Sequence, residues 1–180
     1  MAVCRREIER ALSGLLKYAY VLGRDGELAR ELVQETVVKA LSTSNQPESP
    51  DAFRPWLFSI LRNAHIDHMR RDRRHNDRHV AVDNMDALPA IGGHVEDTVI
   101  NQLSVREAVM RLPDSHRDIL ALVDIAGFSY AEASATLGIP KGTVMSRLSR
   151  ARRAMLLEIS AGNVHSIETA RKNKKASVQG

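Results

Sequence analysis

The sequence predicts an all-α protein made of two small helical domains joined by a flexible linker. Aromatic residues make up only 4% of the chain, while Ala, Leu, Arg and Glu, which favour helices over strands, are abundant. Apolar residues recur at spacings of three and four in both halves, and the stretch between the halves loses this period. We expect one domain over 8–75, a linker over 76–95, a second domain over 96–158 and a basic, disordered tail over 159–180.

The first domain is expected to open with two helices. Ile8, Leu12 and Leu15 have helical spacing, and the Gly-containing stretch 22–26 signals a turn. A second helix follows over 27–41. Its apolar face is predicted to comprise Leu28, Leu32, Val33, Val37, Ala40 and Leu41. The opposite, polar side is a candidate interface.

A loop and a third helix complete the first domain. Residues 42–55 contain three prolines among Ser, Thr, Asn and Gln, which predicts a loop, with helix resuming near Pro55. The third helix is expected to bury Leu57 and Ile60, and Trp56 is interpreted as a core residue rather than a base-stacking one. Beyond Ala64 this helix becomes strongly basic, so it would join the core to a polyanion.

The second domain is predicted to end in a helix-turn-helix. Pro113 opens a helix, and Ser129 with Glu132 three residues later forms a capping box for the next one. That helix should stop at Leu137, because Gly138 permits a left-handed turn and Pro140 leads into a further helix. Two helices therefore meet across a tight corner.

The last helix has one apolar stripe and one basic face. Val144, Leu148, Ala151 and Met155 recur at spacings of four, three and four. Between 141 and 153 there are five Lys or Arg residues and no Asp or Glu, so burying the stripe would present an uncompensated positive face. DNA phosphate is its natural complement, and the other interpretation is a helix hairpin with a merely solvated surface.

Composition excludes several classes of protein. A single cysteine, Cys4, rules out an internal disulfide framework and a Cys-based zinc cluster. The pairs His65 and His68, or His75 and His79, lack the Cys or clustered carboxylates that would complete a metal site, so no metal and no cofactor are expected. No apolar run suits a membrane span or a signal peptide, which predicts a cytoplasmic protein without membrane insertion.

Both halves resemble one family, the extracytoplasmic-function (ECF) RNA polymerase sigma factors of the sigma-70 family, over about residues 8–157. In the front half, 31–37 is similar to the family's Asp-Leu-Val-Gln-Glu-Thr-Phe helix, and 53–67 to its Trp-Leu-x-x-Ile-x-x-Asn-x-x-x-Asp segment. In the back half, 112–113, 128–132 and 142–152 resemble its most specific signature. The chain departs from the family pattern at Glu31, Val37, Ala133 and Met145.

The resemblance implies a bacterial, non-catalytic subunit that binds core RNA polymerase, recognises promoters and helps to open them, for a stress-responsive regulon. It also implies an anti-sigma factor as a partner, and no small-molecule substrate. Polymerase docking would fall to Glu31, Gln34 and Glu35.

The resemblance further implies two DNA interfaces. For the minus-thirty-five element, we expect base contacts from Ser146, Ser149 and Arg150, and phosphate contacts from Lys141, Thr143, Arg147 and Arg153. For the minus-ten element, the loop 42–55 and Asn63 would supply a pocket for an unpaired base. Cations for the displaced strand would be Arg62, Arg70, Arg71, Arg73 and Arg74.

Three other functions compete with this one. A stand-alone helix-turn-helix regulator would not need a front half that resembles a polymerase-docking domain. A sigma-like decoy that binds protein would have little reason to retain Arg147, Arg150, Arg152 and Arg153. A recombinase would need a nucleophile with an activating partner or an acidic metal cluster, and neither is apparent.

Overall fold

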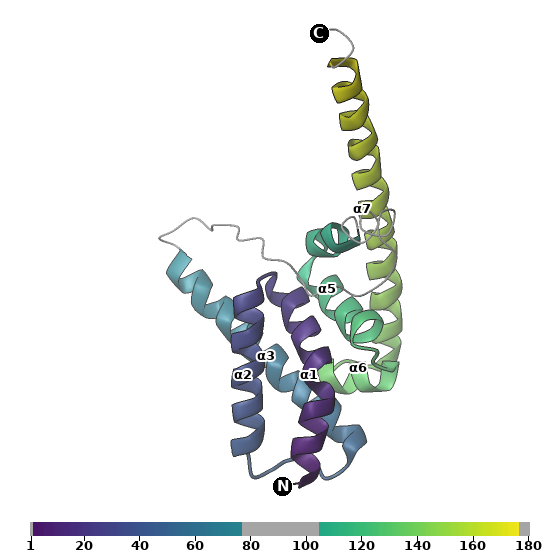
Figure 1. The fold of residues 1–180 in the computed structure, drawn as a ribbon. Helices are drawn as coiled ribbons and strands as arrows, with labels where there is room; N and C mark the ends of the chain where they lie inside the picture. The colour runs from purple at the N-terminus through teal and green to yellow at the C-terminus, as the bar shows by residue number, and fades with distance from the viewer. Residues whose placement is uncertain (1, 77–104, 177–180) are drawn as a thin grey trace.

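The computed structural model describes residues 2–76 and 105–176, which form helices joined by short turns and loops, with no strand among them (Figure 1). The all-α prediction is confirmed. Apart from Asn76, the predicted linker 76–95 lies outside the described residues, as do 96–104. The N-terminal half contains α1 (Ala2–Gly23), α2 (Gly26–Ser42) and α3 (Pro50–Asn76). The C-terminal half contains a helix over 105–111, α5 (Asp114–Leu120), the π-helical turn η1 (Ala121–Ile125), α6 (Tyr130–Leu137) and α7 (Lys141–Ala176).

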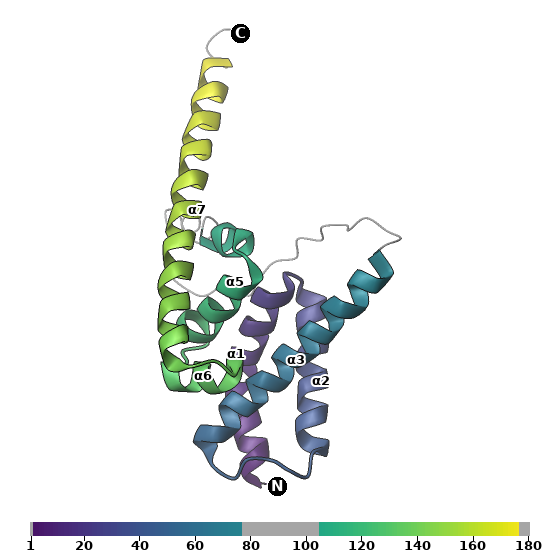
Figure 2. The same ribbon diagram turned by 180° about the vertical axis from the view of Figure 1, so that it is seen from behind.

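The N-terminal half is a bundle in which α3 crosses α1 and α2 on the face that is turned towards the viewer in Figure 2. A tight turn joins α1 to α2: Arg24 has a φ of 60°, and the Asp25 carboxylate accepts a hydrogen bond of 2.7 Å from the Leu28 backbone N–H, which caps α2. Leu15, Leu57 and other apolar side chains fill the space between the three helices. The periodicity placed these helices correctly.

The predicted loop 42–55 is shorter than expected. The loop spans only 43–49, and α3 begins at Pro50, where the missing N–H of proline has no helical partner to lose. The Ser49 carbonyl accepts hydrogen bonds from the backbone N–H groups of Ala52 and Phe53, 3.1 and 2.9 Å long. Pro55 lies inside the helix, which tolerates the loss of one backbone hydrogen bond there.

The C-terminal half begins its main helix after Pro113, as predicted. The Pro113 carbonyl accepts hydrogen bonds from the backbone N–H groups of His116 and Arg117, and α5 then widens into η1, where Ala126 N–H bonds to the Ala121 carbonyl at 2.8 Å. No sequence pattern signalled this π-helical turn. Gly127, with a φ of 71°, ends it and turns the chain towards α6.

Helix α7 is longer than expected and projects beyond the rest of the molecule (Figure 1). A disordered tail was expected after Ile159, but α7 continues to Ala176. The segment contains no proline after Pro140 and includes several Ala, Arg, Lys and Glu residues, which favour helix.

The two halves pack directly against each other, so their buried side chains form one continuous apolar cluster. Helix α3 contacts α6, and α1 contacts both α5 and η1. At the centre of this contact the rings of Phe58 and Phe128 have centroids 4.6 Å apart, and each is at most 3% exposed. We call this arrangement the docked state.

Candidate polymerase and nucleic-acid interfaces

The corner of the helix-turn-helix has the geometry that the sequence predicted. Ser129 Oγ accepts a hydrogen bond of 3.2 Å from the Glu132 backbone N–H, and the Glu132 carboxylate accepts one of 2.8 Å from the Ser129 N–H. Helix α6 ends at Leu137, and Gly138 follows with a φ of 64° in the left-handed region. The capping box and the glycine C-cap are therefore confirmed.

Helix α7 divides into a buried and an exposed face at its N-terminal end. Val144, Leu148 and Ala151 are buried, and Met155 packs partly buried against the core, so the predicted stripe is confirmed. The residues proposed for the minus-thirty-five element fall into two groups. Lys141, Ser146, Ser149, Arg150 and Arg153 are exposed, whereas Thr143 and Arg147 are half-buried at the flank of the stripe.

The exposed face of α7 also includes an apolar residue, Met145, and an arginine, Arg150, whose side chain is held by hydrogen bonds within the helix. Met145 is 51% exposed and was not among the predicted contacts. The Arg150 guanidinium donates hydrogen bonds to the Ser146 carbonyl and hydroxyl oxygens at 3.2 and 3.4 Å. The two residues are one helical turn apart, and their side chains are in contact. A bidentate guanidinium beside a hydroxyl is suited to the edge of a guanine in the major groove.

One arginine of α7, Arg152, forms an ion pair within the protein. Arg152 donates two hydrogen bonds to the Asp124 carboxylate, 3.0 and 2.6 Å long, and this pairing raises its pKa. Asp124 belongs to η1, so the pair ties α7 to the preceding helix. The basic face turned to solvent is therefore smaller than the sequence count of arginines indicated.

Helix α2 presents the residues proposed for polymerase docking on one surface. Glu31, Gln34 and Glu35 are all exposed and lie on the side away from the buried Leu32 and Thr36. Val38 and Leu41, 67% and 57% exposed, continue this side by one and two turns. Leu41 was assigned to the apolar face, and its exposure corrects that assignment because Ala29, Thr36 and Ala40 fill the buried face instead.

The residues proposed for the minus-ten element lie along α3. Asn63, Arg70, Arg71 and Arg73 are exposed, and Arg74 lies in the same helix with its side chain outside the described part. Trp56 is half-buried, with its ring 5.3 Å from that of Phe53, which agrees with a packing role. Asn63 lies well along α3 from the loop 43–49, which ends where α3 begins at Pro50.

Arg62 differs from the other cations of α3 because it already has a carboxylate partner. Its Nε donates a hydrogen bond of 2.7 Å to Asp118 in α5. Burial alone would lower the pKa of Arg62, but the pairing with Asp118 outweighs it and raises the pKa. In the docked state Arg62 is thus committed to the other half of the molecule.

A second arginine, Arg54, joins the two halves and was missed at the sequence level. Its guanidinium donates to the Glu132 carboxylate at 3.2 Å and to the Ala126 carbonyl, and lies 4.2 Å from the centroid of the Phe128 ring. Burial alone would raise the pKa of Glu132, but hydrogen bonds from Ser129 and Arg54 hold that pKa below its ordinary value. Nothing local in the sequence signals a contact between residues so far apart.

The histidines do not assemble a metal site in the part of the chain that the structure describes, where no three His, Cys, Asp or Glu side chains are grouped suitably. His79 lies outside that part. Among the same residues, none of the helices combines the length and apolar character needed to cross a membrane.

Comparison with known proteins identifies both halves. Residues 8–75 match the family described as Sigma-70 region 2, and residues 102–155 match Sigma-70, region 4. The ECF RNA polymerase sigma factor EcfG of Rhodopseudomonas palustris is 33% identical over 150 residues, covering 82% of this chain and 80% of that protein. The ECF sigma factor SigL of Mycobacterium tuberculosis is 32% identical over 165 residues, covering 88% of this chain and 89% of its own.

Solved structures agree with this assignment. The sigma factor RpoE of Bartonella quintana, in complex with the anti-sigma factor NepR, superposes with a TM-score of 0.71 at 28% identity, over 89% of this chain and 98% of that one. CnrH, in complex with the cytosolic domain of CnrY, shares the fold with a TM-score of 0.63 at 24% identity, over 88% of each chain. The chain therefore belongs to the extracytoplasmic-function RNA polymerase sigma factors of the sigma-70 family.

Proposed function

We propose that this sigma factor divides its work among three surfaces. The exposed side of α2 docks on core RNA polymerase, the exposed face of α7 reads the minus-thirty-five element, and α3 with the loop 43–49 engages the minus-ten element. The observation that carries the proposal is the face of α7, where Ser146, Ser149 and Arg150 are exposed opposite the stripe that packs into the core. A helix packed in this way can enter a major groove without disturbing its own core.

Base readout on α7 is assigned to Arg150 and Ser146, and phosphate contact to the surrounding cations. Lys141 and Arg153 are exposed at the two ends of the face, where they can reach the strands that flank the groove. Arg147 is half-buried, so only its guanidinium end would reach phosphate.

Substitution of Arg150 tests this assignment. Arg150→Ala should weaken binding to promoter DNA by about 1–3 kcal/mol, because it removes a bidentate base contact, and should leave binding to scrambled DNA nearly unchanged. Arg111→Ala is a matched control, since Arg111 is exposed but lies outside α7. The measurement is fluorescence anisotropy with both DNAs at one salt concentration. An equal loss on both DNAs would show that Arg150 contacts phosphate only.

Polymerase docking is assigned to Glu31, Gln34 and Glu35, with Val38 and Leu41 supplying apolar contact beside them. A polar rim next to exposed aliphatic side chains is the usual composition of a protein interface. Replacing both Gln34 and Glu35 by Ala should weaken the complex with core polymerase by roughly tenfold or more. Glu9→Ala, on the exposed side of α1, should leave it unchanged. Unaltered assembly of the double variant, measured by size exclusion or interferometry, would remove α2 from the interface.

The same proposal places the protein in the bacterial cytoplasm, serving a stress-responsive regulon under the control of an anti-sigma factor. Support comes from the Bartonella relative, whose solved structure is a complex with the anti-sigma factor NepR. Neither an enzymatic activity nor a cofactor is part of this function. Co-purification of this sigma factor with a tagged candidate anti-sigma factor encoded in the same genome tests the proposed inhibition.

A further inference from the structure

The exposed face of α7 contains one long side chain that can form neither a strong hydrogen bond nor an ion pair. Met145 is 51% exposed, whereas the other large apolar side chains among residues 141–153, those of Val144 and Leu148, are buried in the core. A thioether has no hydrogen atom to donate to a phosphate. Any contact that Met145 makes with DNA must therefore be mainly apolar.

Met145 lies in the part of α7 that would enter a groove most deeply. Helix α7 begins at Lys141, and the first turns of a recognition helix are those that contact base edges. In the first two turns, 141–148, the exposed side chains are those of Lys141, Met145 and Ser146. The Ser146 hydroxyl already accepts a hydrogen bond from Arg150, and the ammonium of Lys141 is suited to phosphate. Met145 is thus the apolar side chain that base edges would meet first.

A position close to Met145 on the same face has no side chain. Gly142 precedes Met145 by three residues and is exposed, and a Cβ placed there would meet no atom within 4 Å. Helix α7 is therefore narrower at Gly142, which allows a base pair to approach its backbone closely. A methionine side chain has several rotatable bonds, so Met145 can adapt its position to a base held beside it.

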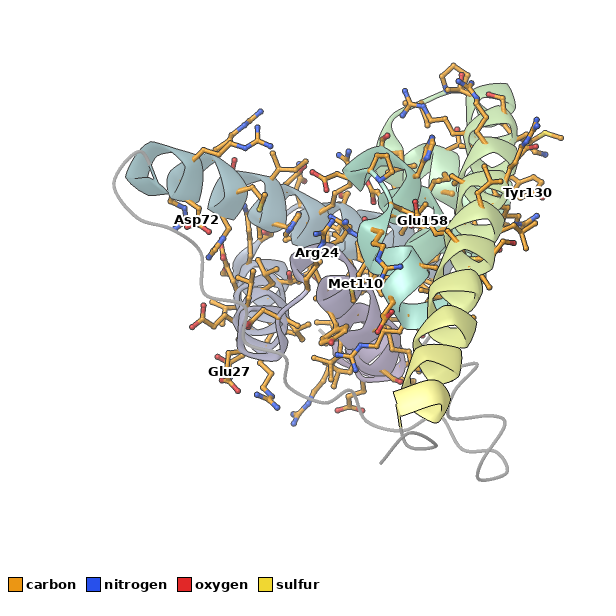
Figure 3. All side chains as sticks on the ribbon, turned by 90° about the horizontal axis from the view of Figure 1, so that it is seen from above. Arg24, Glu27, Asp72, Met110, Tyr130 and Glu158 are labelled. Carbon is orange, nitrogen blue, oxygen red and sulfur yellow. The ribbon has the colours of Figure 1, made fainter. Side chains whose placement is uncertain are left out.

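The arginine that follows Met145 on the same side of α7 is already paired. Arg152 lies seven residues, or about two turns, after Met145 and donates two hydrogen bonds to Asp124. Tyr130 of α6 also acts on Arg152, and Figure 3 shows Tyr130 beside α7 on the side away from the N-terminal helices. On this side of α7, therefore, Arg152 is withheld from phosphate, and Met145 with the exposed Ser149 remains for contact with bases.

The major groove presents one kind of apolar group to such a side chain. All four bases present hydrogen-bond donors or acceptors there, and thymine adds a methyl group at C5. Contact between two apolar groups removes both from water, whereas a methionine placed against a donor or acceptor leaves that polar group unpaired. Met145 would therefore favour a thymine over another base at the same position.

We propose that Met145 is a specificity-determining residue that recognises the C5 methyl group of a thymine in the minus-thirty-five element. The inference rests on the proposed function, because it requires α7 to lie in the major groove. The chain departs from the family pattern at Met145, so this contact is not one that the common pattern supplies. Burial of one methyl group corresponds to about fourfold in affinity.

The test removes the methyl group from the DNA. In a promoter mapped by run-off transcription, deoxyuridine replaces each thymine of the minus-thirty-five element in turn, on either strand, and keeps the hydrogen-bonding groups of the base. The affinity of the reconstituted holoenzyme for each duplex is measured by fluorescence anisotropy at one salt concentration. At one thymine the replacement should weaken binding about fourfold. Equal affinity for every uracil duplex overturns the proposal, as does an element that contains no A·T pair.

Variants show whether Met145 is the residue that reads the methyl group. Met145→Ala should bind the thymine and uracil duplexes equally, and Met145→Leu, which keeps an apolar side chain of similar volume, should retain most of the preference. Leu156→Ala is the matched control, because Leu156 is 61% exposed on the same helix but lies beyond its first turns. It should keep the whole fourfold preference. A preference that survives in Met145→Ala assigns the methyl contact to another residue and contradicts the proposal.

The outcomes separate this inference from the proposed function. If scrambling the minus-thirty-five element weakens binding, and the effect depends on Arg150, α7 reads the element whether or not Met145 takes part. Absence of a thymine effect then counts against Met145 alone. If scrambling the element leaves binding unchanged, both the proposed role of α7 and the role of Met145 are wrong.

Discussion

At the scale of single residues, Glu132 contributes to two structures. It closes the capping box of α6 by accepting from the Ser129 N–H, and it accepts from Arg54 of the other half. These hydrogen bonds stabilise its carboxylate form and hold its pKa below the ordinary value despite partial burial. The helix-turn-helix and the docked state therefore share one carboxylate.

The shared carboxylate predicts a loss of stability in acid. A group with a lowered pKa contributes stability above its ordinary pKa of about 4.3, and the contribution disappears as the pH falls through the lower value in the folded protein. Glu132→Gln should therefore reduce the free energy of unfolding near neutral pH by about 1 kcal/mol and differ little from wild type in acid.

Urea unfolding, followed by the fluorescence of the single tryptophan, Trp56, measures this difference. Glu9→Gln serves as control, because Glu9 is exposed and pairs with Arg5 in its own helix. A deficit for Glu132→Gln that is as large at low pH as at neutral pH would mean that its charge is irrelevant.

At the scale of elements, the glycine that ends α6 sets the corner of the helix-turn-helix. Gly138 has a φ of 64°, and a Cβ at this position would meet no atom within 4 Å. Gly142, at the start of α7, is equally open, but its backbone is helical. The two glycines therefore differ in backbone conformation but not in the free space around a Cβ atom.

This pair predicts opposite effects of one substitution. Gly138→Ala should lower the free energy of unfolding by about 1–2 kcal/mol, because a side chain strains a left-handed backbone. Gly142→Ala should be neutral or stabilising by up to about 1 kcal/mol, since alanine favours helix. Thermal unfolding of both variants gives the comparison. Equal destabilisation by both would point to lost space rather than strain.

Local signals explain why this corner was predictable from the sequence. Ser129, Glu132 and Gly138 act within one or two turns of chain, so their spacing is sufficient to place the cap, the end of α6 and the start of α7. The buried stripe of α7 follows from the same short-range period. Resemblance to a family added the roles of these residues, which spacing alone does not provide.

The contacts between the halves had no such signal. Arg54 and Glu132 are separated by 78 positions and Arg62 and Asp118 by 56, and each of these residues also reads as an ordinary exposed charge on a helix. The exposure of Leu41 was missed for a related reason, because which apolar residues of α2 are covered depends on how α1 and α3 cross it. Both contacts and the exposure of Leu41 depend on tertiary packing, which local sequence patterns do not reveal.

At the scale of the whole molecule, docking of the two halves and promoter binding make different demands on the protein. The docked state ties Arg62 and Arg54 to the C-terminal half and merges both cores into one cluster. Promoter recognition requires two modules to reach separate elements of one duplex while polymerase holds both. On the proposed division of work, the docked state must open before both elements are bound, and binding to polymerase and DNA would supply the free energy for opening.

Run-off transcription with purified core polymerase tests the central claim most directly. At low salt and without an inhibitor, the full chain should direct transcripts to discrete start sites on genomic fragments, and sequencing of the transcript ends should reveal shared upstream elements. The Arg150→Ala variant should lose these starts while still assembling with polymerase. Transcripts that match those of core polymerase alone would contradict the account.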